Sequence, residues 1–212
     1  EISGDSVVLR SPSHYGVDAA VRSHNALYLL AHQMDRGELV LASATIQRAG
    51  KPVMVTARAP GDFKSADALP EGRAKIDNQT RLICAVLDFL TYQMDRHQRN
   101  FMVNPKGAVR LIDHDFSLGH LHPSGSYFGK DFYAGEATGY VGDDALPPKA
   151  AAVVARLSSM SEAEISKQYG LDGGEARVLS QRAKLVATFG LSTAINLDLS
   201  GRIPEVASRL AA

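Results

Sequence analysis

The fold of this chain is decided by residues 88–119, which read DFLTYQMDRHQRNFMVNPKGAVRLIDHDFSLG. The stretch begins on an apolar helical pattern that ends in MDRH, and Asn100 follows five residues after Asp95. Two short apolar segments then flank the turn NPKG, in which Gly107 suits a backbone of positive φ. The second segment runs into the acidic group IDHD. The pattern predicts a helix, a loop and a β-hairpin with acidic side chains after its second strand.

Three side chains in this stretch have the positions that metal-assisted phosphoryl transfer requires. Such a transfer needs a metal that bridges the phosphates, protein oxygens that hold the metal, and a carboxylate near the incoming hydroxyl. Asp113 follows the buried second strand, and Asn100 lies on the connector that enters the hairpin, so both can offer oxygen to Mg²⁺. Asp95 lies upstream, where it can accept a hydroxyl proton. We therefore predict Asp95 as the catalytic base and Asn100 and Asp113 as metal ligands.

Neighbouring residues are predicted to support these three. Arg96 and His97 adjoin Asp95 and can hold its loop by hydrogen bonds. Asp115 is predicted to have a supporting role, either as a second metal ligand or as a cap of the turn that follows it.

The rest of the chain has the pattern of a mixed α and β protein. The predicted strands are residues 6–10, 39–47, 52–58, 101–103 and 109–112, with a hairpin turn at residues 49–51 and a hinge at residues 59–62. The predicted helices are residues 17–36 with Gly37 as C-cap, 73–94, 149–158, a helix from the Ser161 capping box to Gly170, 175–189 and a terminal helix after Pro204. Residues 120–142 are predicted to form a long surface loop.

Composition limits the class of protein. The 212 residues are 45% hydrophobic, and 23 Lys and Arg balance 23 Asp and Glu, so no overall charge favours nucleic acid or anionic membrane. No apolar run approaches the ~20 residues that span a bilayer, and no signal peptide is visible, so we expect a cytoplasmic protein. The single cysteine, Cys84, excludes an internal disulfide and a cysteine zinc cluster, and it is predicted to be buried.

The stretch from Leu87 to Gly119 resembles the catalytic segment of atypical kinases related to the phosphatidylinositol 3-/4-kinases. It is also similar to the corresponding segments of secretory-pathway kinases and HipA-like bacterial kinases. Earlier in the chain, RSHNALYLLAHQM resembles the N-lobe helix of these families, and TARAPG resembles their strand that ends in a Pro-Gly hinge. The resemblance covers roughly Ser6 to Gly119, with the most specific motifs in residues 88–119.

The resemblance implies an α+β, bilobal protein-kinase-like fold with a small β-rich N-lobe, residues 1–60, and a mostly helical C-lobe, residues 61–212. It implies ATP and Mg²⁺ or Mn²⁺ as cofactors, and a catalytic hairpin at residues 95–119. By matching position, Asp95 is the catalytic Asp, Asn100 a metal ligand and Asp113 the principal metal ligand. The implied reaction is phosphoryl transfer to a hydroxyl acceptor, with a protein favoured over a lipid because no basic patch or amphipathic anchor is visible.

Two positions depart from the pattern of these kinases. Arg10 stands where they have a Lys that holds the α- and β-phosphates, and we predict that Arg10 contacts phosphate instead. Alignment on YLL of the helix places His24 near the position of their Glu. No Gly-rich phosphate loop is visible, and the start at Glu1 without Met leaves open a truncated N-lobe.

Two other functions fit the same residues. A kinase-like module that binds nucleotide or a partner without catalysis is consistent with Arg10 and His24. A metal-dependent hydrolase would instead hold zinc or iron with histidines and acidic residues near the hairpin. The residues considered for that site are His97, His114, His120, His122, Asp95, Asp113 and Asp115.

Overall fold

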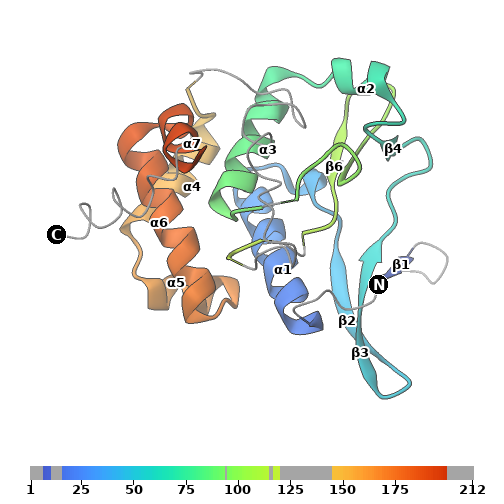
Figure 1. The fold of residues 1–212 in the computed structure, drawn as a ribbon, viewed down its shortest axis with the longest axis horizontal. Coiled ribbons are helices and arrows are strands. Elements are labelled where there is room, and N and C mark those ends of the chain that lie inside the picture. The colour runs from blue at the N-terminus through green and yellow to red at the C-terminus, as the bar shows by residue number, and fades with distance from the viewer. Residues whose placement is uncertain (1–6, 11–15, 94, 115–116, 120–144, 200–212) are drawn as a thin grey trace.

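The computed structural model describes residues 7–10, 16–93, 95–114, 117–119 and 145–199 of the chain. In that part the protein is an α+β structure with two small antiparallel sheets and a mostly helical remainder, as Figure 1 shows. The predicted α+β class is therefore confirmed. The predicted loop at residues 120–142 and the helix after Pro204 lie outside the described residues.

The elements follow one another in the order strand, helix, strands, helices, hairpin and helices. They are β1 Val7–Arg10, α1 Val17–Gln33, η2 Gly37–Leu39, β2 Ser43–Arg48, β3 Lys51–Ala57, β4 Lys64–Ser65, α2 Pro70–Ala74, α3 Asn78–Leu90, β5 Phe101–Val103, β6 Val109–Leu111, α4 Pro148–Ser159, α5 Glu162–Tyr169, α6 Gly173–Phe189 and α7 Leu191–Leu199. Among the described helices, none is long and apolar enough to cross a membrane.

The first sheet has the strand order β1-β3-β2, with both pairs antiparallel. Strands β2 and β3 form the predicted hairpin, in which Arg48 pairs with Lys51. The two turn residues, Ala49 and Gly50, have φ values of 50° and 74°. Positive φ at both central residues matches the right-handed twist of the strands, which explains why a glycine is found there.

The second sheet has the order β4-β5-β6 and contains the hairpin predicted from residues 101–112. Its turn is closed by the Asn104 side chain, whose Oδ1 accepts hydrogen bonds from the backbone N–H groups of Lys106 (3.0 Å) and Ala108 (2.9 Å). Gly107 has a φ of 89°, as predicted, and a Cβ there would lie 2.5 Å from the Lys75 carbonyl oxygen. Only glycine therefore fits this turn.

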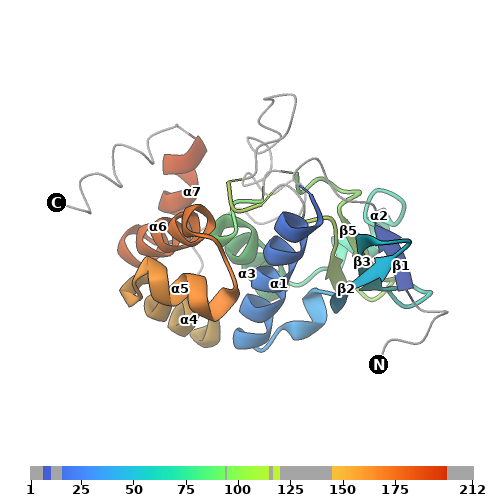
Figure 2. The same cartoon turned by 90° about the horizontal axis from the view of Figure 1, so that it is seen from below.

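Helices α1 and α3 lie between the strands on one side and the C-terminal helices α4–α7 on the other, in both views (Figures 1 and 2). Their apolar faces share one core with β5, β6 and α4–α7. Fully buried members of this core are Leu27, Leu30, Leu87, Phe89, Phe101, Leu111, Leu179 and Ala183.

Polar contacts also fix α1 to the C-terminal helices. The Arg22 guanidinium makes an ion pair with Glu175 at the start of α6, with a Nε–Oε2 distance of 2.8 Å. The Tyr169 hydroxyl of α5 donates to Gln33 Oε1 at 2.6 Å. Helix α1, which lies between β1 and β2 in the chain, is thus attached to helices α5 and α6 by polar contacts.

The predicted helix at residues 73–94 is wrong in its extent, because it is two helices. Helix α2 ends at Ala74, and Asp77 then caps α3 by accepting a 2.8 Å hydrogen bond from the Thr80 backbone N–H. A side-chain cap of this kind starts a new helix even where apolar spacing continues through the break. The helical pattern of residues 82–90 itself is correct.

The end of α1 also differs from the prediction. The helix stops at Gln33, and the left-handed residue is Asp35, with a φ of 58°. Gly37, predicted as the C-cap, begins the short helix η2, and β2 therefore starts only at Ser43. Asp can replace Gly at a left-handed position because its short polar side chain tolerates that backbone.

The C-terminal helices follow the predicted caps. Ser161 and Glu164 form the predicted capping box of α5, and Gly170 closes the helix with a φ of 67°. A second box, Asp172 with Glu175, starts α6 and was not predicted, nor was helix α7.

Cys84 is buried within α3, as predicted, with 1% of its surface exposed. Burial raises the pKa of its thiol to about 12. Because burial both shields the thiol and disfavours its reactive thiolate form, we expect no measurable reaction of the folded protein with a disulfide reagent. The same reagent should titrate one thiol in denaturant, and rapid labelling of the native protein would contradict the buried placement.

Candidate functional site

The candidate site is built on the loop between α3 and β5 and on the segment that follows β6. Asp95 and Asn100 lie in contact across the loop. The Asn100 Nδ2 donates to the Asp95 carboxylate at 2.9 Å and to the Asp95 carbonyl at 2.6 Å. Asn100 is buried and its amide nitrogen is used in these two bonds, so Oδ1 is the atom through which it could bind the predicted metal.

Asp113 follows β6 and is joined to the same loop through Gln93. The Gln93 Nε2 donates to the Asp113 carbonyl at 2.7 Å, and its Oε1 accepts from the Asp95 backbone N–H at 3.4 Å. Asp113 has a φ of 59°, a left-handed conformation that Asp tolerates better than most residues. The backbones of Asp95 and Asp113 therefore meet at the side-chain amide of one buried glutamine, each bonded to a different atom of that amide.

Arg96 connects the residues of the candidate site through buried contacts. Its guanidinium pairs with Asp88 of α3 at 3.0 Å, and both side chains are completely buried. It also donates to the carbonyl of Asn100 and to the carbonyl of Ile112, the latter at 2.5 Å. One side chain thus connects the end of α3, the loop before β5 and the segment after β6. Burial raises the pKa of the Asp88 carboxyl, and the adjacent Arg96 opposes that shift.

His97 lies beside Asp95 near the surface. Its Nδ1 accepts a 3.1 Å hydrogen bond from the Arg99 backbone N–H, so the neutral ring carries its proton on Nε2. That nitrogen lies 3.6 Å from Asp95 Oδ1, close to the carboxylate but beyond hydrogen-bond distance.

A chain of buried polar groups continues from Arg96 to α1. The guanidinium lies 3.0 Å from His114 Nδ1, and the His114 ring centre is 5.2 Å from that of His24. His24 Nε2 in turn donates to the Leu41 carbonyl at 2.7 Å. His24 of α1 is thus a buried imidazole packed against the residue that follows Asp113.

The end of α3 is also held by Arg182 from α6. Its guanidinium donates to the Phe89 carbonyl at 3.1 Å and stacks over the ring of Tyr92 at 3.8 Å. A 2.8 Å ion pair with Asp198 neutralises the charge. The end of α3, from which the loop that bears Asp95 begins, is therefore held against α6.

Several of these supporting residues were not predicted from the sequence. Gln93, Asp88 and Arg182 are isolated polar residues without a local pattern, and Asp88 lies within an apolar helical stretch. His114 was considered only as a ligand of the alternative hydrolase site. The sequence signal for the Asp88–Arg96 pair was an acidic residue within an apolar helical stretch, eight residues before an Arg.

Other predicted site residues lie outside what the structure describes. Arg10 is placed in β1, where its backbone pairs with Met54 of β3, but its side chain is outside the described part. Asp115, His120 and His122 are outside it altogether. The predicted phosphate contact of Arg10 and the supporting role of Asp115 stay predictions.

The described side chains at this site could supply only part of the ligands of a metal ion. Within the described ranges, no group of three or more His, Cys, Asp or Glu side chains is arranged to hold a metal. That finding gives the hydrolase alternative no support from the described residues. Mg²⁺ is usually held by one or two protein oxygens together with phosphates and water, and Asn100 Oδ1 and Asp113 are groups of this kind.

Comparison with known proteins assigns no family. No family model matches the chain, and no curated protein matches it. Function must therefore be inferred from the residues and their geometry.

Proposed function

We propose that this protein is an ATP- and Mg²⁺-dependent phosphotransferase of the kinase type, with Mn²⁺ as an alternative metal, that acts on a hydroxyl acceptor. The observation that best supports this is the contact of Asp95 with Asn100, together with the Gln93 bridge from Asp95 to Asp113. These contacts bring the proposed base, Asp95, close to the two proposed metal-ligand residues at one end of the β5–β6 hairpin, Asp113 through its backbone carbonyl. A protein hydroxyl is the acceptor we favour.

The proposal includes a bilobal arrangement with residues 1–60 as N-lobe and 61–212 as C-lobe. The order of β1, α1, β2 and β3 supports it, since a helix inserted between strands of a small sheet precedes the Pro60-Gly61 segment. The helical remainder after residue 61, interrupted by the short sheet β4-β5-β6, is consistent with the larger lobe.

Each residue has a distinct role in the proposed reaction. Asp95, whose side chain is 16% exposed, orients the acceptor hydroxyl and takes its proton. Asn100 and Asp113 hold Mg²⁺, which would neutralise charge on the transferred phosphate. Arg96 and Gln93 keep these groups at fixed separations, because precise placement contributes much of the rate of phosphoryl transfer. Arg10 is proposed to contact the nucleotide phosphates.

A radiolabel assay on the full chain tests this function directly. The protein is incubated with γ-labelled ATP and Mg²⁺, alone and with a mixture of protein acceptors, and transfer to protein is followed with and without chelator. We expect label in protein that depends on the metal. Nucleotide binding is measured in parallel as the rise in unfolding temperature with ATP.

The second candidate is a non-catalytic kinase-like module that binds nucleotide or a partner. His24 favours it, because an imidazole bonded to the Leu41 carbonyl replaces the acidic residue that the resembled kinases have there. Saturable, Mg²⁺-dependent ATP binding without any transfer or autophosphorylation would support this second function. If the protein shows neither ATP binding nor phosphoryl transfer, both candidate functions are contradicted.

A further inference from the structure

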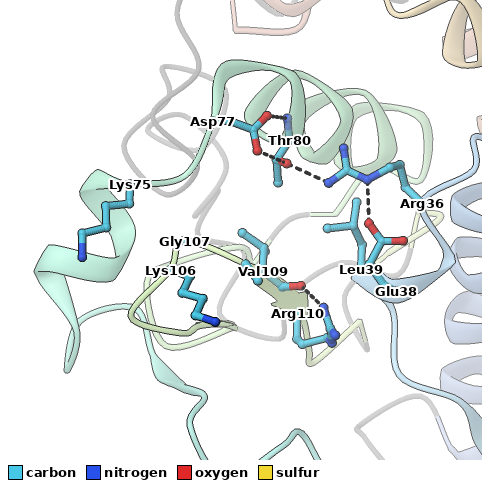
Figure 3. Close-up of a pocket in the computed structure, with 11 residues that line it drawn as sticks. Arg36, Glu38, Leu39, Lys75, Asp77, Thr80, Lys106, Gly107, Val109 and Arg110 are labelled. Carbon is cyan, nitrogen blue, oxygen red and sulfur yellow. Dashed lines mark hydrogen bonds and ion pairs between the residues drawn. The ribbon is translucent and has the colours of Figure 1, made fainter.

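A separate pocket of about 270 Å³ lies at the other end of the β5–β6 hairpin from Asp95 and Asn100 (Figure 3). It is formed by η2, the junction of α2 and α3, and the hairpin turn with β6. We call it the basic pocket, because its charged lining residues are four cations and two acids. They are Arg36, Lys75, Lys106 and Arg110, with Glu38 and Asp77.

Both acids of the basic pocket are engaged in local structure. Glu38 pairs with Arg36 at 2.6 Å. Asp77 accepts hydrogen bonds from the Thr80 backbone N–H at 2.8 Å and from the Thr80 hydroxyl at 2.7 Å. Burial alone would raise the pKa of Asp77, but these bonds outweigh it and lower the pKa, so its carboxylate stays ionised as the cap of α3.

Arg110 is a half-buried cation on β6. Its guanidinium lies over the Phe63 ring at 4.7 Å, and one Nη donates to the Val109 carbonyl at 2.8 Å. Burial lowers its pKa, although the nearby charges of Glu38 and Asp62 oppose that effect. Because a guanidinium has five N–H donors, Arg110 has donors left for an anionic ligand.

Lys106 supplies a second cation from the hairpin turn. Its ammonium is exposed and makes no hydrogen bond or ion pair with any other residue that the structure describes. Figure 3 shows Lys106 and Arg110 extending from the hairpin, with Arg36 facing them from the segment after α1 and Lys75 at the far edge. Lys106 thus keeps all its donors for a ligand and Arg110 most of them, whereas Arg36 and Lys75 already bond neighbouring groups.

The walls of the basic pocket are held in place before any ligand arrives. The turn approaches the end of α2 so closely that a Cβ on Gly107 would lie 2.5 Å from the Lys75 carbonyl oxygen. The Lys75 ammonium donates to the Pro105 carbonyl at 2.8 Å, which joins the turn to α2 again. A pocket that needs no rearrangement loses little binding free energy to ordering.

We propose that the basic pocket binds a small multivalent oxyanion, a phosphate or a polycarboxylate, through Lys106 and Arg110. The net positive lining selects an anion, and the guanidinium fork suits the paired oxygens of phosphate or carboxylate. A volume near 270 Å³ lies at the small end of ligand pockets and fits such an ion better than a nucleotide. This site is distinct from the proposed phosphotransferase site and does not depend on it.

Calorimetric titration of the full chain at low salt with pyrophosphate, with citrate and with inorganic phosphate tests the proposal. We expect saturable binding of at least one of them, and the preferred ion identifies phosphate or carboxylate as the recognised group. The double variant Lys106→Gln with Arg110→Gln should bind that ion about tenfold more weakly or worse. If the double variant fails to fold, the single Lys106→Gln variant, which changes an exposed residue, should still show weaker binding of the same ion.

The matched control removes the same charges elsewhere. Arg177 and Lys184 are exposed on α6, so Arg177→Gln with Lys184→Gln should leave the affinity unchanged. Equal weakening by both pairs would show general charge attraction and overturn the site. Absence of saturable binding for all three ions would also overturn it.

Discussion

Asparagine in place of Asp113 is expected to lower metal-dependent phosphoryl transfer by at least about a hundredfold while the protein stays folded. The substitution removes the negative charge that the proposed function assigns to the metal. It keeps the size of the side chain and suits the φ of 59° at this position, since Asn also tolerates the left-handed region. The change therefore tests charge rather than backbone strain. The measurement is the initial rate of label transfer at saturating Mg²⁺.

Asp35→Asn is the matched control for that experiment. Asp35 has nearly the same backbone conformation, with a φ of 58°, but lies after α1 with a 72% exposed side chain near Lys149. Its transfer rate and unfolding temperature should equal those of the wild type. If Asp113→Asn retained the wild-type rate, Asp113 would not be the principal metal ligand.

Methionine in place of Arg96 is expected to destabilise the protein by about 3–5 kcal/mol. It would leave the Asp88 carboxylate buried without its ion-pair partner, and the carbonyls of Asn100 and Ile112 without this donor. For a chain of this size the loss corresponds to a fall of roughly 10 °C in the unfolding temperature. Equilibrium denaturation in urea gives the free energy of unfolding directly.

Two further variants separate the buried pair from a general effect of losing an arginine. Arg99→Met removes a guanidinium that is 79% exposed, near Asp67, and should leave the unfolding temperature almost unchanged. The double variant Asp88→Leu with Arg96→Met should lose less than the two single changes added together, because no unpaired charge is then buried. Additive losses would mean that the two side chains do not act as a pair.

The sequence by itself was sufficient where the deciding contacts are local. The capping box of Ser161 and Glu164, the left-handed Gly170 and the turns at Gly50 and Gly107 all involve groups a few residues apart. Such features depend on backbone conformation and on nearby side chains, which spacing and residue type express directly. The single helix predicted over residues 73–94 failed because apolar periodicity continues across a break that Asp77 creates.

For the candidate site, spacing predicted Asp95, Asn100 and Asp113 but not the contacts that hold them in place. Asp95 and Asn100 are five residues apart, and their hydrogen bond is as local as a cap. Gln93 reaches Asp113 across twenty residues, and its role follows only from the path of the hairpin.

Only the tertiary structure decided how the buried charges are paired. Asp88 lies in an apolar helix, yet it faces Arg96, and Arg22 of α1 meets Glu175 across 153 residues. A buried charge must find an opposite charge or hydrogen-bonding groups, because leaving it without them costs several kcal/mol. Which partner it finds depends on where folding brings distant segments together. Residues 88–119 thus determined their own turn and hairpin, while the Arg96 contacts that connect this stretch to the end of α3 were set by the three-dimensional path of the chain.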